Sequence, residues 1–414
     1  MPEPIDESDH GENAPSSAQR RKKGALGEVF AAFLKLGLTS FGGPIAHLGY
    51  FRDEFVVRRR WLNEKGYADL VALCQFLPGP ASSQVGFALG LLRAGPLGAA
   101  AGWLAFTLPS AIILVLFALG AATFGGPVGS GILHGLKVVA VAIVAQAVWG
   151  MARSLCPDRE RASIALAAAL IVIFIAGFMG QIAAILAGGL GGLWLCRSGA
   201  GDGAASHVRF PLTRASGLIS LGLFFGLLLG LPLLASATAW QGVAVFDAFY
   251  RAGALVFGGG HVVLPLLETE IVRSGWVSAD AFLAGYGAAQ AIPGPLFTFA
   301  AYLGMVLGPE PNGFLGAGIA LASIFLPGFL LLLGVIPFWD SFRMQPSAQA
   351  MMRGTNAAVV GILAAALYDP VWSNAIRGPY DFALAMSCFV LLMVWKRPPW
   401  NVVLIAALGG ILID

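Results

Sequence analysis

The stretch Gln75-Phe76-Leu77-Pro78-Gly79-Pro80 occurs a second time, as Gln290-Ala291-Ile292-Pro293-Gly294-Pro295. Each copy places Pro-Gly-Pro inside an apolar segment. Proline removes an amide donor and clashes with the preceding turn, and glycine adds backbone freedom, so neither segment continues as one helix through the tripeptide. Inside a membrane, the backbone groups left bare by such a break are costly unless protein, water or a ligand pairs with them. Two matched breaks therefore predict a binding site.

The composition predicts that these breaks lie in a membrane. The chain has 414 residues, of which 57% are hydrophobic and 11% charged, and its mean hydropathy is +0.79. Soluble domains carry about 25% charged residues. The many separate apolar runs, each about 20 residues long, are typical of a polytopic helix bundle. A β-barrel would show alternating polarity, which is absent. The predicted fold class is all-α.

A comparison of the chain with itself reveals a duplication. Lys35 matches Arg251 and Gly42-Gly43 matches Gly258-Gly259 at a spacing of 216 residues, and the two Pro-Gly-Pro motifs match at 215. Further along, Leu108-Pro109 matches Leu326-Pro327, and His134-Gly135-Leu136-Lys137 matches Arg353-Gly354-Thr355-Asn356. So many ordered matches with so little drift indicate a tandem repeat.

The number of apolar segments predicts that the second repeat is inverted. We count thirteen candidate spans, six in each repeat and one, 216–236, between them. An odd number between equivalent positions turns the second copy upside down in the bilayer. The predicted organisation is a disordered cytoplasmic tail (1–24), an N-terminal membrane repeat (25–198), a linker with a central transmembrane helix (199–240) and a C-terminal inverted repeat (241–414).

Loop charges favour a cytoplasmic N-terminus at most positions, but one loop disagrees. Residues 51–65 contain five basic residues and fall outside if the spans 28–50 and 66–92 each cross the membrane once. They fall inside if both spans enter and return as re-entrant hairpins, broken at Gly42-Gly43 and at Pro78-Gly79-Pro80. Single crossings are the expectation, with re-entrant hairpins as the alternative.

Paired cations and glycine runs suggest an anion site. Lys35 and Arg251 precede the two glycine breaks, and a cation within an apolar span usually faces a cavity. The alternative is that one or both lie near a helix end and reach the interface. The runs Gly42-Gly43 and Gly258-Gly259-Gly260 either present amides to an anion or only permit close helix packing. The repetition of both features favours a site.

Polar residues flank both Pro-Gly-Pro motifs. Ser82 and Ser83 follow the first and Thr298 follows the second. Because proline is well tolerated in a first helical turn, we expect each tripeptide to open a half-helix whose amides, with these hydroxyls, cradle an oxyanion. Gln75 and Gln290 precede the prolines, and they either join the site or only satisfy the carbonyls freed by the break.

Two histidines follow the glycine breaks, His47 and His261. A histidine can carry a proton near neutral pH, but a lone membrane histidine is more often a hydrogen-bonded structural residue, and we expect that role here. His261 nevertheless belongs to the expected site because it directly follows Gly260. Carboxylates at membrane depth are scarce, so the sequence predicts no carboxylate site for sodium or protons.

The chain resembles a known family at these motifs. Phe41-Gly42-Gly43-Pro44, Phe257-Gly258-Gly259-Gly260-His261, the paired Pro-Gly-Pro motifs and the duplicated layout are similar to the chromate ion transporter family, long two-repeat type, over about residues 25 to 413. The resemblance implies export of chromate, a tetrahedral dianion similar to sulfate, across the bacterial inner (plasma) membrane, and hence chromate resistance. It does not fix which residues bind the anion.

The sequence thus predicts a secondary active transporter with a midplane site between two inverted repeats. The alternatives are a transporter of sulfate or another oxyanion and an anion channel. There is no Walker motif and no histidine or cysteine spacing for haem, iron–sulfur or zinc. We therefore expect no enzyme activity, no cofactor, no metal and no nucleic-acid partner. The expected partners are an oxyanion and the lipid bilayer, and homo-oligomerisation is left open.

Overall fold

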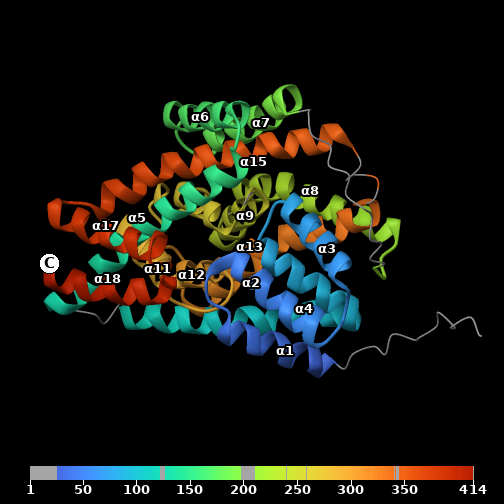
Figure 1. Ribbon diagram of the computed structural model, residues 1–414, viewed down its shortest axis with the longest axis horizontal. Helices are drawn as coiled ribbons and strands as arrows, with labels where there is room; N and C mark the ends of the chain where they lie inside the picture. The colour runs from blue at the N-terminus through green and yellow to red at the C-terminus, as the bar shows by residue number, and fades with distance from the viewer. Residues whose placement is uncertain are drawn as a thin grey trace, which may run out of the picture.

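A computed structural model describes residues 26–121, 126–196, 210–238, 240–257, 259–339, 341 and 345–413. The predicted tail (1–24) and Gly258 lie outside these ranges. Within them every regular element is a helix, which confirms the all-α prediction (Figure 1).

The two repeats and the helix between them contain the following elements. The first repeat comprises α1 (Leu26–Thr39), α2 (Gly43–Phe51), η1 (Arg52–Arg58), α3 (Glu64–Phe76), α4 (Ala81–Ala121), α5 (Gly126–Leu155), α6 (Arg159–Phe174) and α7 (Phe178–Leu195). The central helix is α8 (Arg214–Ala237). The second repeat comprises α9 (Gln241–Ala254), η2 (Gly260–Val262), α10 (Val263–Leu267), η3 (Glu268–Val272), α11 (Ala279–Ala289), η4 (Leu296–Thr298), α12 (Phe299–Val306), α13 (Gly313–Val335), η5 (Ile336–Phe338), α15 (Pro346–Ala366), η6 (Leu367–Trp372), α16 (Ser373–Ala375), α17 (Pro379–Met393) and α18 (Pro399–Ile413).

The first two predicted spans are hairpins. Glu28, in the first turn of α1, accepts hydrogen bonds from Arg59 Nη1 at 3.2 Å and from Trp61 Nε1 at 3.3 Å, so the return arm formed by α2 and η1 ends beside the start of α1. Arg93, at the end of the arm that follows α3, also donates to Glu28, at 2.9 Å. The expectation of single crossings for 28–50 and 66–92 is therefore wrong, and the re-entrant alternative holds.

The long helix α4 changes direction in its middle. Ala94 and Gly95 leave helical geometry, and the residues on either side form an antiparallel pair in which Gly90 lies against Gly98. The arm 81–93 closes the second hairpin, and residues 96–121 form a helix about 39 Å long, enough to cross a hydrocarbon core of about 30 Å.

By length and composition, fewer helices can span a membrane than the thirteen predicted segments. Among the described residues, six helices are long and apolar enough: Ala81–Ala121, Gly126–Leu155, Phe178–Leu195, Arg214–Ala237, Gly313–Phe338 and Pro346–Ala375. Apolar segments that turn back at a break look like crossings in a hydropathy pattern, because the pattern records composition and not direction.

The second repeat uses the same plan. Arg251 pairs with Glu270, at the positions equivalent to Lys35 and Glu54, so α9 and its return arm form a hairpin like that of α1. Gly304 lies against Gly316, the counterpart of the contact between Gly90 and Gly98. With the single helix α8 between the repeats, the hairpins of the second repeat open on the opposite face.

The outer helices of each repeat pack on the other repeat. Helices α6 and α7 lie along α15, whereas α17 and α18 lie along α5 (Figure 1). Glycines allow these close contacts: Gly192 meets Gly354 between α7 and α15, and Gly135 meets Ala406 between α5 and α18. Small residues at helix crossings let backbones approach closely in membranes. The two repeats are thus interlocked.

Candidate functional site

The breaks of one repeat bond to the breaks of the other. The amide of Gly79 donates to the carbonyl of Val256 at 2.7 Å, and the amide of Gly294 donates to the carbonyl of Ser40 at 2.9 Å. Each Pro-Gly-Pro motif therefore contacts the tip of the other repeat's glycine hairpin. We call this region the tip junction: residues 40–44 and 78–84 of the first repeat, and 256–257, 259–261 and 290–298 of the second.

The middle glycine of each Pro-Gly-Pro is required by its conformation and by its neighbours. Gly79 and Gly294 have φ values of 120° and 102°, which side-chain-bearing residues rarely adopt. A Cβ on Gly79 would lie 3.1 Å from Cα of Gly328, and one on Gly294 would clash with Ser110 Oγ. Each glycine faces a membrane-crossing helix of the other repeat. The contact is at the residue that directly follows the proline within that helix.

The carbonyls freed by the breaks are paired differently in the two repeats. Ser110 Oγ donates to Pro293 O at 2.6 Å. Gln84 Nε2 donates to Pro78 O at 3.0 Å and to Gly328 O at 2.9 Å. Because Gly328 occupies the position equivalent to Ser110, it has no hydroxyl to offer, and Gln84 from the hairpin replaces it.

Gln75 and Gln290 do not pair with the proline carbonyls in the described residues. Gln75 is exposed, and the buried Gln290 Nε2 has no hydrogen-bond partner. Sequence reasoning noticed the run that contains Gln84 but gave that residue no role. The repeat signal does not identify it, because its equivalent in the second copy is Phe299.

Each Pro-Gly-Pro opens a half-helix, as predicted. Helix α4 begins at Ala81 and η4 begins at Leu296, directly after the second proline of each motif. Ser82 Oγ lies 3.4 Å from His47 Nδ1, and Thr298 Oγ1 donates to Pro295 O at 2.7 Å. Pro80 and Pro295 are buried, and Pro78 and Pro293 carry the paired carbonyls.

Several buried polar atoms at the tip junction and its border lack a protein partner. Within the described residues these atoms include Ser40 Oγ, Ser83 Oγ, Gln290 Nε2 and Thr107 Oγ1. Thr107 lies one helical turn before Ser110, which bonds to the junction. A buried donor left unpaired costs about 1–3 kcal/mol. A buried polar atom without a protein partner is expected to bond to water or to a bound group. Among the described residues Gln84 Oε1, an acceptor at the junction, is unpaired as well.

The glycine breaks and histidines complete the tip junction. Gly42 and Gly43 have φ values of 102° and 77°, and no side chain caps the start of α2. Gly259 precedes the short helix η2, which begins at Gly260. His47 Nε2 lies 3.2 Å from Ser40 O, and His261 Nδ1 lies 2.7 Å from Tyr286 OH. Both histidines are hydrogen-bonded, as predicted.

The two predicted cations are each paired with carboxylates. Lys35 Nζ lies 3.4 Å from Glu54 Oε2, and its side chain is 52% exposed. Arg251 is only 18% exposed, donates two parallel hydrogen bonds of 2.9 Å to Glu270 and contacts Asp247 Oδ2 at 2.9 Å. Its guanidinium also lies over the Phe178 ring. Neither cation carries unbalanced charge at the tip junction, and sequence reasoning did not find their partners.

Broken helices from two inverted repeats, which meet at a buried region with unpaired donors, are typical of membrane transport proteins. The chain belongs to the chromate transporter family, whose model matches residues 27–193 and 243–411, one match in each repeat. Proteins of this family are membrane transporters, not enzymes. Among the described residues, no group of three or more His, Cys, Asp or Glu side chains could hold a metal ion.

Individual relatives match over most of their length. The chain is 31% identical to the chromate transport protein of Pseudomonas aeruginosa, over 92% of this chain and 90% of that one. It is 29% identical to the probable chromate transport protein of Synechococcus elongatus, over 94% and 95% of the two chains. It is 27% identical to the chromate transport protein of Cupriavidus metallidurans, over 90% and 89%. No solved structure matches the chain.

Proposed function

We propose that this protein is a secondary active transporter that exports chromate across the bacterial inner membrane and thereby confers chromate resistance. The oxyanion binds at the tip junction. The observation that carries the proposal is the group of buried donors without protein partners where the broken helices of the two repeats bond to each other. Chromate has only acceptor oxygens, so it suits a region that offers donors.

The proposal assigns two kinds of role at the tip junction. Donors to the oxyanion come from backbone amides and side chains: Gly42, Gly43, Gly259, Gly260, Ser83 and Gln290. Ser82 and Thr298, whose hydroxyls already bond to His47 and to the Pro295 carbonyl, hold the starts of the half-helices beside the oxyanion. Gly258 and His261 flank Gly259 and Gly260 in the sequence and belong to the same proposed site. Pro78, Gly79, Pro80, Pro293, Gly294 and Pro295 shape the site. Uncharged donors in a water-poor site bind anions well because the low dielectric strengthens each hydrogen bond.

Lys35 and Arg251 remain in the proposal as the cations that precede the tips. Lys35 lies one turn before the end of α1 at Thr39, and Arg251 lies one turn before the end of α9 at Ala254. Their carboxylate partners lie on the return arms of the same hairpins. A movement of either return arm would therefore change the potential at the tip.

The orientation follows from charge. The open ends of the first repeat's hairpins carry the basic residues Arg52, Arg58, Arg59, Arg60 and Arg93. Basic segments favour the cytoplasmic face, so in the proposal this face and the N-terminus are cytoplasmic. Rocking of one repeat against the other then exposes the tip junction alternately to each side.

The test is uptake of radiolabelled chromate into everted membrane vesicles, with and without a proton gradient. Saturable uptake that sulfate inhibits only weakly is expected of a chromate exporter. If sulfate is taken up equally well or better, the substrate is sulfate and not chromate. Single-channel currents would show that the protein is a channel and not a carrier.

Lys35→Ala and Arg251→Gln, both normalised to folded protein, test the cations in the same assay. If both variants take up chromate like the wild type, the two cations have no part in transport. Gly226→Ala on α8 is the control, because a Cβ there has no described atom within 4 Å.

A further inference from the structure

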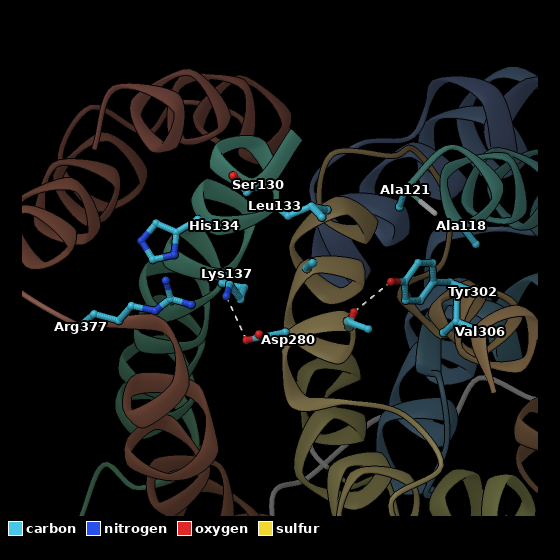
Figure 2. Close-up of a pocket in the computed structure, with 12 residues that line it drawn as sticks. Ala118, Ala121, Ser130, Leu133, His134, Lys137, Asp280, Tyr302, Val306 and Arg377 are labelled. Carbon is cyan, nitrogen blue, oxygen red and sulfur yellow. Dashed lines mark hydrogen bonds and ion pairs between the residues drawn. The ribbon is translucent and has the colours of Figure 1, made fainter. Parts of the chain in front are cut away.

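A cavity with charged residues in its lining lies away from the tip junction. It has a volume of about 420 Å³ and is bordered by the end of α4, the first half of α5, the start of α11 and the segment before α17 (Figure 2). Its charged or titratable lining residues are His134, Lys137, Asp280, Tyr302 and Arg377, and the Tyr302 hydroxyl donates to the carbonyl of Ala281 at 3.0 Å. We call it the α5 cavity. It lies on the face where α4 ends, opposite the open ends of the first repeat's hairpins.

Lys137 is the buried cation of this cavity. Its side chain is 6% exposed, and its Nζ lies 2.9 Å from Asp280 Oδ1 (Figure 2). Asp280, by contrast, is 65% exposed and lies in the first turn of α11. A buried ammonium needs a partner, whereas an exposed carboxylate can be solvated by water. Asp280 can therefore leave Lys137 at low cost when another anion takes its place.

A second buried group faces the same cavity. His134 is 4% exposed, and its Nε2 lies 2.7 Å from Asp381 Oδ1. Its Nδ1 is buried and has no hydrogen-bond partner among the described residues. The other oxygen of Asp381 accepts from the backbone amide of Arg377 at 2.8 Å. Both oxygens of Asp381 are thus engaged, so Asp280 is the carboxylate that competes for Lys137.

Arg377 adds an exposed cation at the rim of the cavity. It is exposed, and in Figure 2 its guanidinium points toward Lys137 and His134. An arginine fork can bind two oxygens of a tetrahedral oxyanion, while an ammonium binds a third. Lys137 and Arg377 thus offer two cations of the right chemistry around one space.

A related but different cavity lies at the equivalent place beside α15, and its lining comes mainly from the first repeat. It has a volume of about 290 Å³, and it is lined by Arg353 and Asp158, the equivalents of His134 and Arg377. Asn356 stands at the position of Lys137 and does not line it. The buried lysine is therefore a feature of the first repeat alone. General packing needs do not explain it, because the second repeat keeps the same helix without a charge there.

We propose that the α5 cavity is a second binding site for a tetrahedral oxyanion, in which the anion displaces Asp280 from Lys137. This inference rests on the proposed function, since it takes the ligand to be of the transported class. The site would collect or release the oxyanion on the face opposite the first repeat's hairpin openings. Asp280 acts there as a tethered competitor that keeps Lys137 paired when the site is empty.

The experiment measures equilibrium binding of radiolabelled sulfate and chromate to purified protein in lipid nanodiscs. Lys137→Asn installs the residue of the equivalent position, Asn356, and should weaken binding to this site about tenfold, the loss of one charge-assisted hydrogen bond. Asp280→Asn removes the competitor and should tighten binding. Arg377→Gln, at an exposed position, should weaken binding without a folding defect. Arg153→Gln removes an exposed charge from the far end of α5 and should leave binding unchanged.

Lys137→Asn and Asp280→Asn are expected to change the affinity in opposite directions, and this difference distinguishes a binding site from a structural ion pair. If the ion pair is only structural, Lys137→Asn and Asp280→Asn shift affinity in the same direction or not at all, and that result overturns the second site. Chromate uptake by wild-type vesicles together with unchanged binding in all three cavity variants would also overturn it while leaving the proposed function intact. Absence of any sulfate or chromate binding to the wild type, combined with absent uptake, would overturn both.

Discussion

The two glycine hairpins have the same backbone plan but opposite charge balance. In the first repeat Glu54 is buried and accepts from Lys35, Arg58 and Arg59 at 3.4, 2.6 and 2.7 Å, so cations outnumber the carboxylate. In the second repeat one buried cation, Arg251, is shared by Asp247 and Glu270. Both hairpins keep the equivalent ion pair, Lys35–Glu54 or Arg251–Glu270. The residues around the pair give the first hairpin an excess of cations and the second an excess of carboxylates.

This difference shows how an inverted repeat produces two unlike faces. The hairpins of the repeats open on opposite sides, so the basic excess of the first and the acidic excess of the second lie on opposite sides as well. The extra carboxylate of the second repeat, Asp247, stands where the first repeat has Ala31. A symmetric backbone thus carries an asymmetric charge distribution.

The largest effect is expected at the tip junction, where both repeats place a glycine with positive φ between two prolines. Gly79→Ala and Gly294→Ala each force a positive φ on alanine, and Gly294→Ala also clashes with Ser110 Oγ. Strain of about 1–3 kcal/mol at a site that must change shape should reduce chromate uptake by about 5- to 150-fold. Uptake per folded protein in everted vesicles measures this. If both variants take up chromate at the wild-type rate, the tip junction is not part of the transport pathway.

The next largest effect is a difference in stability between variants of the two cations. Arg251→Gln leaves two buried carboxylates without their cation and should lower the free energy of unfolding by about 3–5 kcal/mol. Lys35→Gln leaves Glu54 with Arg58 and Arg59, so it should cost about 1 kcal/mol or less. Thermal unfolding in one detergent compares the pair. Equal losses of stability would show that the charge balance of the hairpins does not matter.

A smaller change is expected from the extra carboxylate. Asp247→Asn leaves Arg251 with both hydrogen bonds to Glu270 and relieves repulsion between two acids, so the free energy of unfolding should change by less than about 1 kcal/mol. The same unfolding assay applies. A loss as large as that of Arg251→Gln would mean that Asp247, and not Glu270, is the principal partner.

The smallest change in stability is expected when the first repeat receives the residue that the second repeat has at the equivalent position. Ala31→Asp places a carboxylate one turn before Lys35, at an exposed position. Because both side chains reach water, the change in unfolding free energy should stay within about 0.5 kcal/mol. A clear stabilisation would show that Lys35 is less solvated than its exposed fraction indicates.

Sequence reasoning found the breaks but not what pairs with them. The Pro-Gly-Pro motifs and the equivalence of Lys35 and Arg251 are visible because duplication repeats them. Gln84 and Ser110 are invisible to that comparison, because their equivalents are Phe299 and Gly328. Hydropathy likewise missed the hairpins, since an apolar segment that turns back at a glycine has the same composition as one that crosses.

The sequence by itself determined that this is a helical membrane protein made of two inverted copies with broken helices, because composition, repeat spacing and proline chemistry are local properties of the chain. Only the tertiary structure decided that the breaks of one repeat bond to those of the other, that the hairpins re-enter, and that Lys137 shares a cavity with Asp280. These are contacts between residues far apart in the chain. Their geometry is set by how whole helices pack, which no local pattern records.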